Sequence, residues 1–439
     1  MRPFRSLVLL TLVTSAPGPV LAETTLPLSL AQALGRAGEA SPRLDQLRAL
    51  EAGAGAALRG ARAQRMPQLL LGASYTRVSD VPEFRFTLPG GEIRTLFPNI
   101  PDNTRTRADL TLPLYTGGRV QGGIRSAEQQ RLASASDVEA GQEDLVWETA
   151  NAYWSLVTAR EAEAVVRQTI ASYDAHLEDA RNLLEQGMVA RNDLLAVQVA
   201  RDRAELERLE AANRFEAANA NLLRLLALPA DTRIDPTEPV ALPESAPEDV
   251  EALVAAAQSR RPEIAALRAR VQAAQSGVGV ARSAKRPQVS LQGAFEYSNP
   301  NQRVLPLEPR WQSNWSLGVA LSLNAFDGGR ASAAAAEARA RADVVKAQLQ
   351  ELERGVRLQV TTRLLDLATA RAALEVAGRS LEAARENVRV SGDRYREGVS
   401  PSSDLLDAET SLLRAGLDRT LAATQVRVAQ AGLDRAAGR

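Results

Sequence analysis

Two stretches of the sequence, "LTLPLYTGGRVQ" (residues 110–121) and "LSLNAFDGGRAS" (residues 321–332), share one pattern. In each, alternating apolar residues, the pattern of a strand, end at a Gly-Gly pair that opens a long run with helical composition. Glycine permits the φ values of a sharp turn and adds no side chain at a crowded joint. We therefore predict strand-to-helix joints at Gly117, Gly118, Gly328 and Gly329. A phosphate-binding loop is not expected, because it needs a Lys-Ser/Thr ending and wider glycine spacing.

Further landmarks recur at nearly the same separation. "RMPQLLLGASYTR" (65–77) matches "KRPQVSLQGAFEY" (285–297), 220 positions later. The two Gly-Gly pairs are 211 positions apart, as are "LLEQGMVARNDLL" (183–195) and "RYREGVSPSSDLL" (394–406). Self-similarity at a fixed separation indicates a tandem repeat of one structural unit.

The repeat sets the expected domain organisation. We assign a first structural repeat to residues 23–228 and a second to residues 248–439, joined by a linker at 229–247 whose prolines exclude a helix. Each repeat is predicted to run as helix, strand, loop, strand, very long helix, tight turn and helix. The turns are expected near 187–193 and 398–404.

Composition and the N-terminus restrict the protein class. Lys plus Arg and Asp plus Glu each number 53, so no strong net charge attracts nucleic acid. The sequence has no cysteine, which excludes disulfides, a cysteine nucleophile and a lipid anchor on an N-terminal cysteine. Residues 1–22 combine two arginines, a short apolar run and the ending Val-Leu-Ala, the pattern of a signal peptide. The mature chain is therefore expected to be exported.

Four segments of roughly ten residues alternate between apolar and small or polar side chains, at about 67–78, 107–115, 287–297 and 314–324. Such strands suit a membrane barrel with a lipid-facing side and a wet lumen. A soluble sheet resting on a core alternates in the same way, so the pattern leaves both open. Four strands cannot close a barrel, since the smallest have about eight. If the strands span a membrane, several chains must share one barrel.

Very long helices are the second structural signal. No proline occurs in residues 119–186, a segment of about 100 Å if helical. The second repeat shows the same pattern from residue 330 to about 397. Apolar or small residues recur at three- and four-residue steps, which predicts a coiled-coil rod. Only Glu163 interrupts this stripe, which comprises Leu145, Thr149, Ala152, Leu156, Ala159, Val166, Ile170, Tyr173, Leu177, Ala180 and Leu184.

The most specific points of resemblance to a known family are the two Gly-Gly joints and the segments "EQGMVARNDLL", "YREGVSPSSDLLDAE" and "LLRLLALP". With these, the sequence resembles the TolC family of outer-membrane efflux channels over nearly the whole mature chain. The resemblance implies a mainly α fold with β structure: a homotrimer whose twelve strands, four per chain, form one barrel in outer-membrane lipid. A helical coiled-coil tunnel would continue it through the periplasm. Members are exit ducts of efflux or type I secretion systems and work with a periplasmic adaptor protein and an inner-membrane transporter.

The resemblance also assigns roles to residues at the helical turns. Asp404 and Asp407 match the acidic positions of the channel constriction; the alternative is an N-cap at Asp404 and a helix-dipole role for Asp407. Asp193 and Tyr395 match gate hydrogen-bonding positions, although Ser400 stands where the family's best-known gate has arginine. The adaptor-docking turns would comprise Gly187, Met188, Val189 and Ala190 in the first repeat and Gly398, Val399, Ser400 and Pro401 in the second.

Other functions have little support in the sequence. His176 is the single histidine and has no sequence partner for catalysis, so a solvated or helix-packing role is expected. No metal-binding spacing, cofactor motif or catalytic set is present, and we expect no enzyme activity. A periplasmic adaptor is the alternative, since it too combines a coiled-coil hairpin with strands, but the two hairpins argue against it. The scarcity of Met and His favours organic solutes over metals as cargo.

Overall fold

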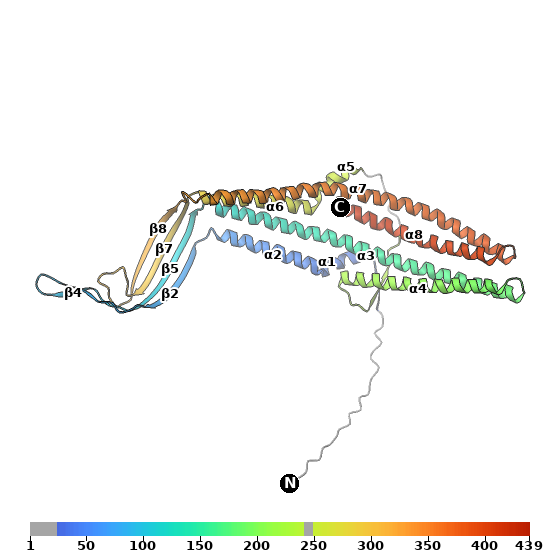
Figure 1. Ribbon diagram of the computed structural model, residues 1–439, viewed down its shortest axis with the longest axis horizontal. Coiled ribbons are helices and arrows are strands. Elements are labelled where there is room, and N and C mark those ends of the chain that lie inside the picture. The colour runs from blue at the N-terminus through green and yellow to red at the C-terminus, as the bar shows by residue number, and fades with distance from the viewer. Residues whose placement is uncertain (1–23, 241–248) are drawn as a thin grey trace, which may run out of the picture. The chain divides into compact units, whose positions relative to one another are not determined.

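The computed structural model describes residues 24–240 and 249–439 (Figure 1). The predicted signal peptide and residues 241–247 of the predicted linker lie outside the described residues. The chain divides into two compact units. Unit 1 comprises Met1–Ser41, Val146–Glu244 and Ala368–Ala431, and unit 2 comprises Pro42–Leu145, Ser245–Leu367 and Gly432–Arg439. Each unit is described by itself.

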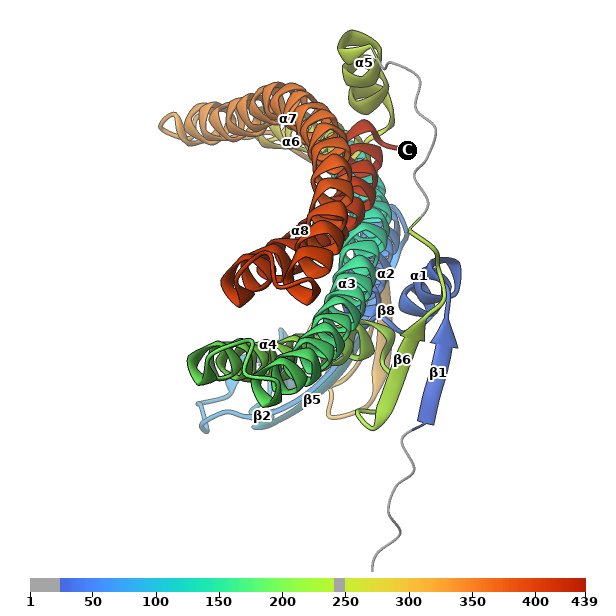
Figure 2. The ribbon, with the colours of Figure 1, turned by 90° about the vertical axis from the view of Figure 1, so that its right-hand side faces the viewer.

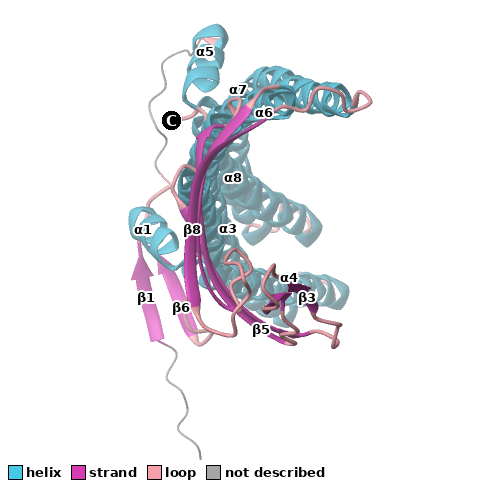
Figure 3. Ribbon diagram, turned by 90° about the vertical axis from the view of Figure 1, so that its left-hand side faces the viewer, coloured by secondary structure: helices cyan, strands magenta, loops and turns pink. Residues whose placement is uncertain are grey.

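The main sheet lies in unit 2. Its strands are β2 (Gln68–Arg77), β5 (Asp102–Tyr115), β7 (Gln288–Asn299) and β8 (Gln312–Ser322), paired antiparallel in the order β2-β5-β7-β8 (Figure 1). Figure 3 shows the strands in magenta. The pairing joins strands from both predicted repeats, because β5 lies beside β7. Among the described residues, β2 and β8 each have only one neighbour, so the sheet has two open edges.

The two faces of this sheet differ in chemistry. One row across it aligns Leu71, Ala108, Phe295 and Trp315, and the next aligns Leu69, Leu110, Gly293 and Leu317. The side chains of Trp315 and Leu317 are 73% and 63% exposed, respectively. This apolar face is thus not covered within the described chain, which argues against the soluble alternative of a sheet resting on its own core.

The opposite face is polar and carries charges. Arg107 Nε lies 2.8 Å from Asp109 Oδ1, and Arg105 Nε lies 3.5 Å from Glu296 Oε1. Leu70 departs from the alternation, since it aligns with Asp109 on this face. Charged pairs on one side and bare apolar residues on the other match a wall between water and lipid.

Two further strands were not predicted. In the sequence, the hairpin of β3 (Phe84–Thr87) and β4 (Ile93–Phe97) comes after β2 and before β5. This is the stretch in which the first repeat is longer than the second. β5 also begins earlier than the expected 107, because its polar residues 102–106 continue the ladder with β2. The hairpin strands have only four and five residues, and residues 102–106 are all polar, so neither segment was recognised from sequence alone.

Unit 2 also contains helices. They are α2 (Pro42–Ala63), α5 (Val250–Arg260), α6 (Pro262–Arg282) and the short 3₁₀ helix η1 (Ser283–Lys285). The unit also contains the first parts of two longer helices, α3 (Arg119–Glu185) and α7 (Arg330–Arg396). Leu58 of α2 packs against Val120 and Ile124 of α3 in one buried cluster.

All four glycines of the strand-to-helix joints have positive φ. The values are +62° and +93° at Gly117 and Gly118, and +63° and +91° at Gly328 and Gly329. The surroundings differ, however. A Cβ at Gly117 would lie 2.7 Å from Arg286 Cβ and 3.0 Å from the Ser283 carbonyl oxygen, whereas a Cβ at Gly328 would meet nothing within 4 Å.

The contrast between Gly117 and Gly328 allows the cost of backbone strain to be separated from the cost of steric crowding. Gly328→Ala is expected to cost about 1 kcal/mol, because only the left-handed backbone resists a side chain. Gly117→Ala is expected to cost roughly 2 to 4 kcal/mol, since overpacking adds to the same strain. Thermal unfolding in detergent, followed by helical circular dichroism, would measure both. Equal losses in the two variants would contradict the role of Arg286 and Ser283.

Unit 1 contains a small parallel sheet that the sequence did not reveal. β1 (Thr24–Leu28) pairs with β6 (Thr232–Pro236), and α1 (Leu30–Ala40) lies beside them (Figure 2). The side-chain amide of Asn219 donates to the Thr232 carbonyl and accepts from the Ile234 amide, both at 3.0 Å. The predicted linker therefore contains a strand, and its described part, residues 229–240, contains no helix.

Unit 1 also contains the later parts of α3 and α7, the helix α4 (Arg191–Leu226) and most of α8 (Ser402–Ala437). Residues 432–437 of α8 belong to unit 2. Val166, Ile170 and Tyr173 of α3 pack with Ala204 of α4 and Leu413 of α8. The predicted stripe is confirmed as the packed side of α3, because its members from Leu145 to Ala180 are all buried and Leu184 is half-buried.

None of the helices in the described ranges has a stretch apolar and long enough to span a bilayer.

Candidate functional site

The two helical turns of unit 1 have the same backbone structure. Gly187 and Gly398 both have φ of +71°. After α3, the amide of Met188 donates to the Leu183 carbonyl at 2.9 Å, and after α7 the amide of Val399 donates to the Arg394 carbonyl at 2.9 Å. This is the Schellman ending, in which glycine takes the left-handed position. Each turn thereby presents an exposed large apolar side chain, Met188 in the first and Val399 in the second.

The acidic pair lies at the start of α8. Asp404 and Asp407 are both exposed and lie three residues apart, so they share one side of the helix. The alternative that placed Asp404 at the N-cap is wrong, because α8 begins at Ser402 and Asp404 already lies within the first turn. An acidic residue in the first turn is still favoured by the helix dipole.

In the part of the chain that the structure describes, the two predicted gate residues are not hydrogen-bonded to each other. Asp193 Oδ2 accepts a hydrogen bond from the Ala190 amide at 3.1 Å, at the start of α4. Tyr395 is buried, and its hydroxyl has no hydrogen-bond partner in residues 24–240 and 249–439. A hydrogen bond between Asp193 and Tyr395 therefore stays a prediction about the assembled channel.

The surroundings of Tyr395 raise the pKa of its phenol. Burial raises the pKa of Tyr395, and the Asp193 carboxylate adds to the rise. The Ser402 hydroxyl counteracts it, although its geometry is not that of a hydrogen bond to Tyr395 Oη. The phenol is therefore held neutral, as a donor without a partner in the described ranges of the chain.

A buried polar cluster at the turn was missed from sequence. His176 of α3 lies with its Nδ1 3.1 Å from Glu409 Oε2 and its Nε2 3.2 Å from Ser402 Oγ, both on α8. The Tyr395 ring meets the imidazole edge-on, with centroids 5.0 Å apart. The structure thus decides between the two expected roles of His176: it faces the packed helices and not solvent. Its partners are more than 200 positions away in the sequence, and no local motif signals them.

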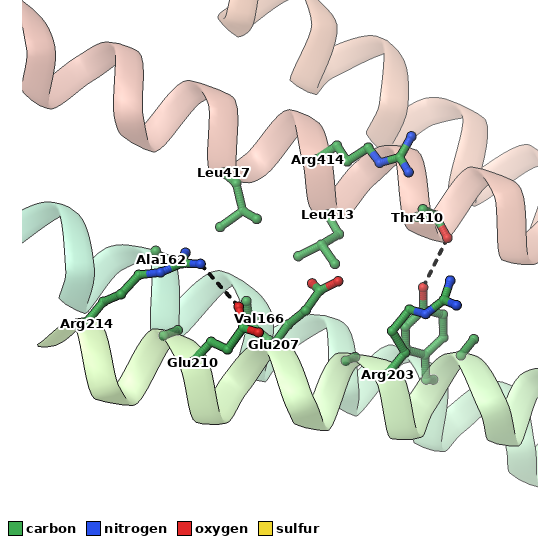
Figure 4. Close-up of a pocket in the computed structure, with 14 residues that line it drawn as sticks. Ala162, Val166, Arg203, Glu207, Glu210, Arg214, Thr410, Leu413, Arg414 and Leu417 are labelled. Atoms are coloured by element: carbon green, nitrogen blue, oxygen red, sulfur yellow. Dashed lines mark hydrogen bonds and ion pairs between the residues drawn. The ribbon is translucent and has the colours of Figure 1, made fainter.

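A groove lies between α4 and α8, over α3, with a volume of about 520 Å³ (Figure 4). Apolar side chains, including Leu413 and Leu417, point into it, and the Tyr173 hydroxyl meets Thr410 Oγ1 at 3.3 Å. Its charged residues are of both signs: Arg203, Glu207, Glu210, Arg214 and Arg414. The mixed charge gives the groove no preference for cations or anions, unlike the acidic pair at the start of α8.

Within the described ranges, no three His, Cys, Asp or Glu residues come together in a way that could hold a metal ion.

An uncovered apolar sheet face, long coiled-coil helices and paired tight turns define an outer-membrane channel with helical extensions. Residues 33–228 and 253–439 match the outer membrane efflux protein family, so the chain belongs to that family. It is a passive outer-membrane exit duct of tripartite efflux systems and not an enzyme. This membership sets aside the alternative of a periplasmic adaptor.

Individual relatives agree with this assignment. The chain is 31% identical over 344 residues to the outer membrane protein OprJ of Pseudomonas aeruginosa. It is 29% identical over 339 residues to protein CyaE of Bordetella pertussis. Both alignments cover 75% of this chain and 69% of the relative. A crystal structure of a membrane protein from Pseudomonas aeruginosa superposes with a TM-score of 0.78 at 26% identity, covering 93% of each chain.

Proposed function

We propose that three copies of this chain form one channel, in which twelve strands close a single barrel in the outer membrane. The observation that carries the proposal is the sheet of unit 2, with two open edges and an uncovered apolar face among the described residues. Lipid does not tolerate unpaired backbone groups, so β2 and β8 must find partners on other copies. The polar face with its Arg105–Glu296 pair would then line the lumen.

Exposed apolar residues on the helices support the same assembly. On α4, Leu195, Val199, Leu206 and Leu209 are exposed at coiled-coil spacing. On α7, Val344, Leu358 and Leu365 are exposed at multiples of seven residues. A single chain leaves these stripes in water, and neighbouring copies would bury them to form the wall of a periplasmic tunnel.

We further propose that the chain arose as a tandem duplication. The helices correspond in length across the two halves: α1 and α5 have 11 residues each, α3 and α7 have 67, and α4 and α8 have 36. The boundaries 23–228, 229–247 and 248–439 are proposed accordingly, with β6 assigned to the linker. A duplicated protomer gives a trimer near-sixfold regularity around its axis.

The partners we propose are a periplasmic adaptor protein and an inner-membrane transporter. The turns Gly187–Ala190 and Gly398–Pro401 are the proposed docking points, supported by their common Schellman geometry and by the exposed Met188 and Val399. Asp404 and Asp407 are the proposed constriction, and Asp193 and Tyr395 the proposed gate pair. The transporter would select the cargo, for which the scarcity of Met and His favours organic solutes over metals.

A charge on the proposed lipid face tests the barrel. Leu317→Arg is expected to cost about 2 to 4 kcal/mol per chain in the membrane, because an arginine would face hydrocarbon. Ser316→Arg, one residue away on the polar face, is the matched control and should insert normally. The measurements are recovery from the outer-membrane fraction, trimer mass in detergent, heat-dependent gel mobility and conductance in planar bilayers.

The wild-type protein is expected to be a detergent-dependent trimer that conducts ions and resists SDS until heated. A stable monomer that needs no detergent would refute the shared barrel. Equal recovery of the Leu317→Arg and Ser316→Arg variants would refute the assignment of the lipid face.

A further inference from the structure

The buried cluster at His176 brackets the acidic pair. His176 bonds to Ser402, the first residue of α8, and to Glu409, about two turns further along the same helix. Asp404 and Asp407 lie between these two points and face solvent. One side chain of α3 therefore holds both ends of the short segment that carries the acidic residues.

The cluster is enclosed. The exposed fractions of His176, Ser402, Glu409 and Tyr395 are all 5% or less. Helix packing elsewhere along α3 uses mainly Ala, Leu, Val and Ile, which need no hydrogen bonds. Placing an imidazole and a carboxylate here requires that both be paired, and such pairing fixes the register of the helices more narrowly than apolar contacts do.

The two hydrogen bonds of His176 do not require one particular protonation state of the imidazole. A serine hydroxyl both donates and accepts, so the imidazole can keep its two bonds in the neutral or the protonated form. The hydroxyls of Tyr395 and Ser400 are buried beside the turn and have no hydrogen-bond partner within residues 24–240 and 249–439. The polar network on the α7 side is thus incomplete, while His176 has a partner on α8 for each of its ring nitrogens.

We propose that His176 is a positioning residue for the channel constriction: through Ser402 and Glu409 it fastens the start of α8 to α3 and thereby holds Asp404 and Asp407 at the closed spacing. The inference rests on the proposed function, because the constriction requires three copies. Movement of the α7–α8 turn away from α3 must break the bond between His176 and Ser402. The bond therefore opposes any opening of the channel by that movement.

The test compares hydroxyl removal with hydroxyl retention in the full-length protein reconstituted in planar bilayers. Ser402→Ala and His176→Leu are expected to raise basal conductance several-fold, and Ser402→Thr is expected to restore it toward the wild-type value. Tyr173→Phe is the matched control. It removes another hydroxyl between α3 and α8, but its partner Thr410 lies beyond the segment from Ser402 to Glu409. It should leave conductance unchanged.

A spectroscopic measurement separates positioning from general loosening. The sequence contains no cysteine, so Asp407→Cys provides a single labelling site in each chain. Spin labels there should show a longer and broader distance between copies when combined with Ser402→Ala, but not with Ser402→Thr or Tyr173→Phe. Ser402→Ala deletes one oxygen only, so it keeps the test valid if His176→Leu fails to fold.

The outcomes distinguish this inference from the proposed function. If the wild type conducts as a trimer but Ser402→Ala changes neither conductance nor label distance, His176 has no positioning role and the channel proposal stands. If Tyr173→Phe opens the channel as much as Ser402→Ala does, the effect is general loosening and the inference fails. If the wild type neither trimerises nor conducts, both proposals fail together.

Discussion

Replacing Asp404 and Asp407 together with alanine is expected to lower the cation-to-anion permeability ratio by roughly tenfold, because a narrow, like-charged ring concentrates counter-ions. Both carboxylates are exposed on one side of α8 and lie within its first two turns. In the proposed trimer the pair is repeated three times around the axis. Bilayer reversal potentials under a salt gradient would measure the ratio directly.

The helix-dipole role predicts a different result for the same variant. If the two carboxylates only stabilise the start of α8, the double variant should lose up to about 1 kcal/mol of stability and keep its selectivity. Glu178→Ala is the control, since Glu178 is also exposed close to the turns but lies on α3. An unchanged reversal potential in the double variant, or an equal shift in the control, would remove Asp404 and Asp407 from the constriction.

The sequence pattern predicted those parts of the fold that depend on local structure, such as the packed side of a helix or the backbone of a turn. The stripe on α3 is an example, because a 3.5-residue repeat specifies the packed side of a helix wherever its partner lies. The Gly-Gly joints are another, since positive φ at Gly117 and Gly328 is a local backbone requirement. The position of β8 was also evident from its strict alternation.

Contacts between segments that are far apart in the sequence could not be predicted from local patterns. β1 and β6 are five residues each and pair in parallel across about 200 positions, and neither carries a clear period. No partner of His176 was evident from the sequence, because its bonds to Ser402 and Glu409 depend on how α3 packs on α8. The roles of Asp193 and Tyr395 depend on copies of the chain that one sequence cannot place.

Arg435→Gln is expected to destabilise the protein by about 3 to 5 kcal/mol, more than Gly117→Ala, because it leaves carboxylates clustered without their common cation. In unit 2 the Arg435 guanidinium lies 3.0 Å from Glu143 Oε2 and 2.8 Å from Asp144 Oδ1, and it also pairs with Glu263. Its side chain is only 13% exposed. Burial disfavours its charge, yet Glu263 and Asp144 raise the pKa of Arg435 above its ordinary value.

The pH dependence of this loss has a definite sign. Burial raises the pKa of Glu143 above its ordinary value; Arg435 and Arg261 lower it, and Glu263 and Asp144 raise it. A carboxyl whose pKa is raised on folding binds its proton more readily in the folded state, so its ionisation reduces stability as pH rises through the folded pKa. Without Arg435 that pKa rises further. The deficit of the variant should therefore be largest near pH 7 and shrink as the pH is lowered toward about 5.

Thermal unfolding of the detergent-solubilised protein across this pH range would measure the deficit. Arg62→Gln is the matched control, because Arg62 also pairs with a glutamate in unit 2, Glu128 at 3.5 Å, but both side chains are well exposed. An exposed pair contributes at most about 1 kcal/mol, so the control should unfold nearly as the wild type does. A pH-independent deficit in Arg435→Gln would show that lost packing, and not the repulsion between clustered carboxylates, causes the destabilisation.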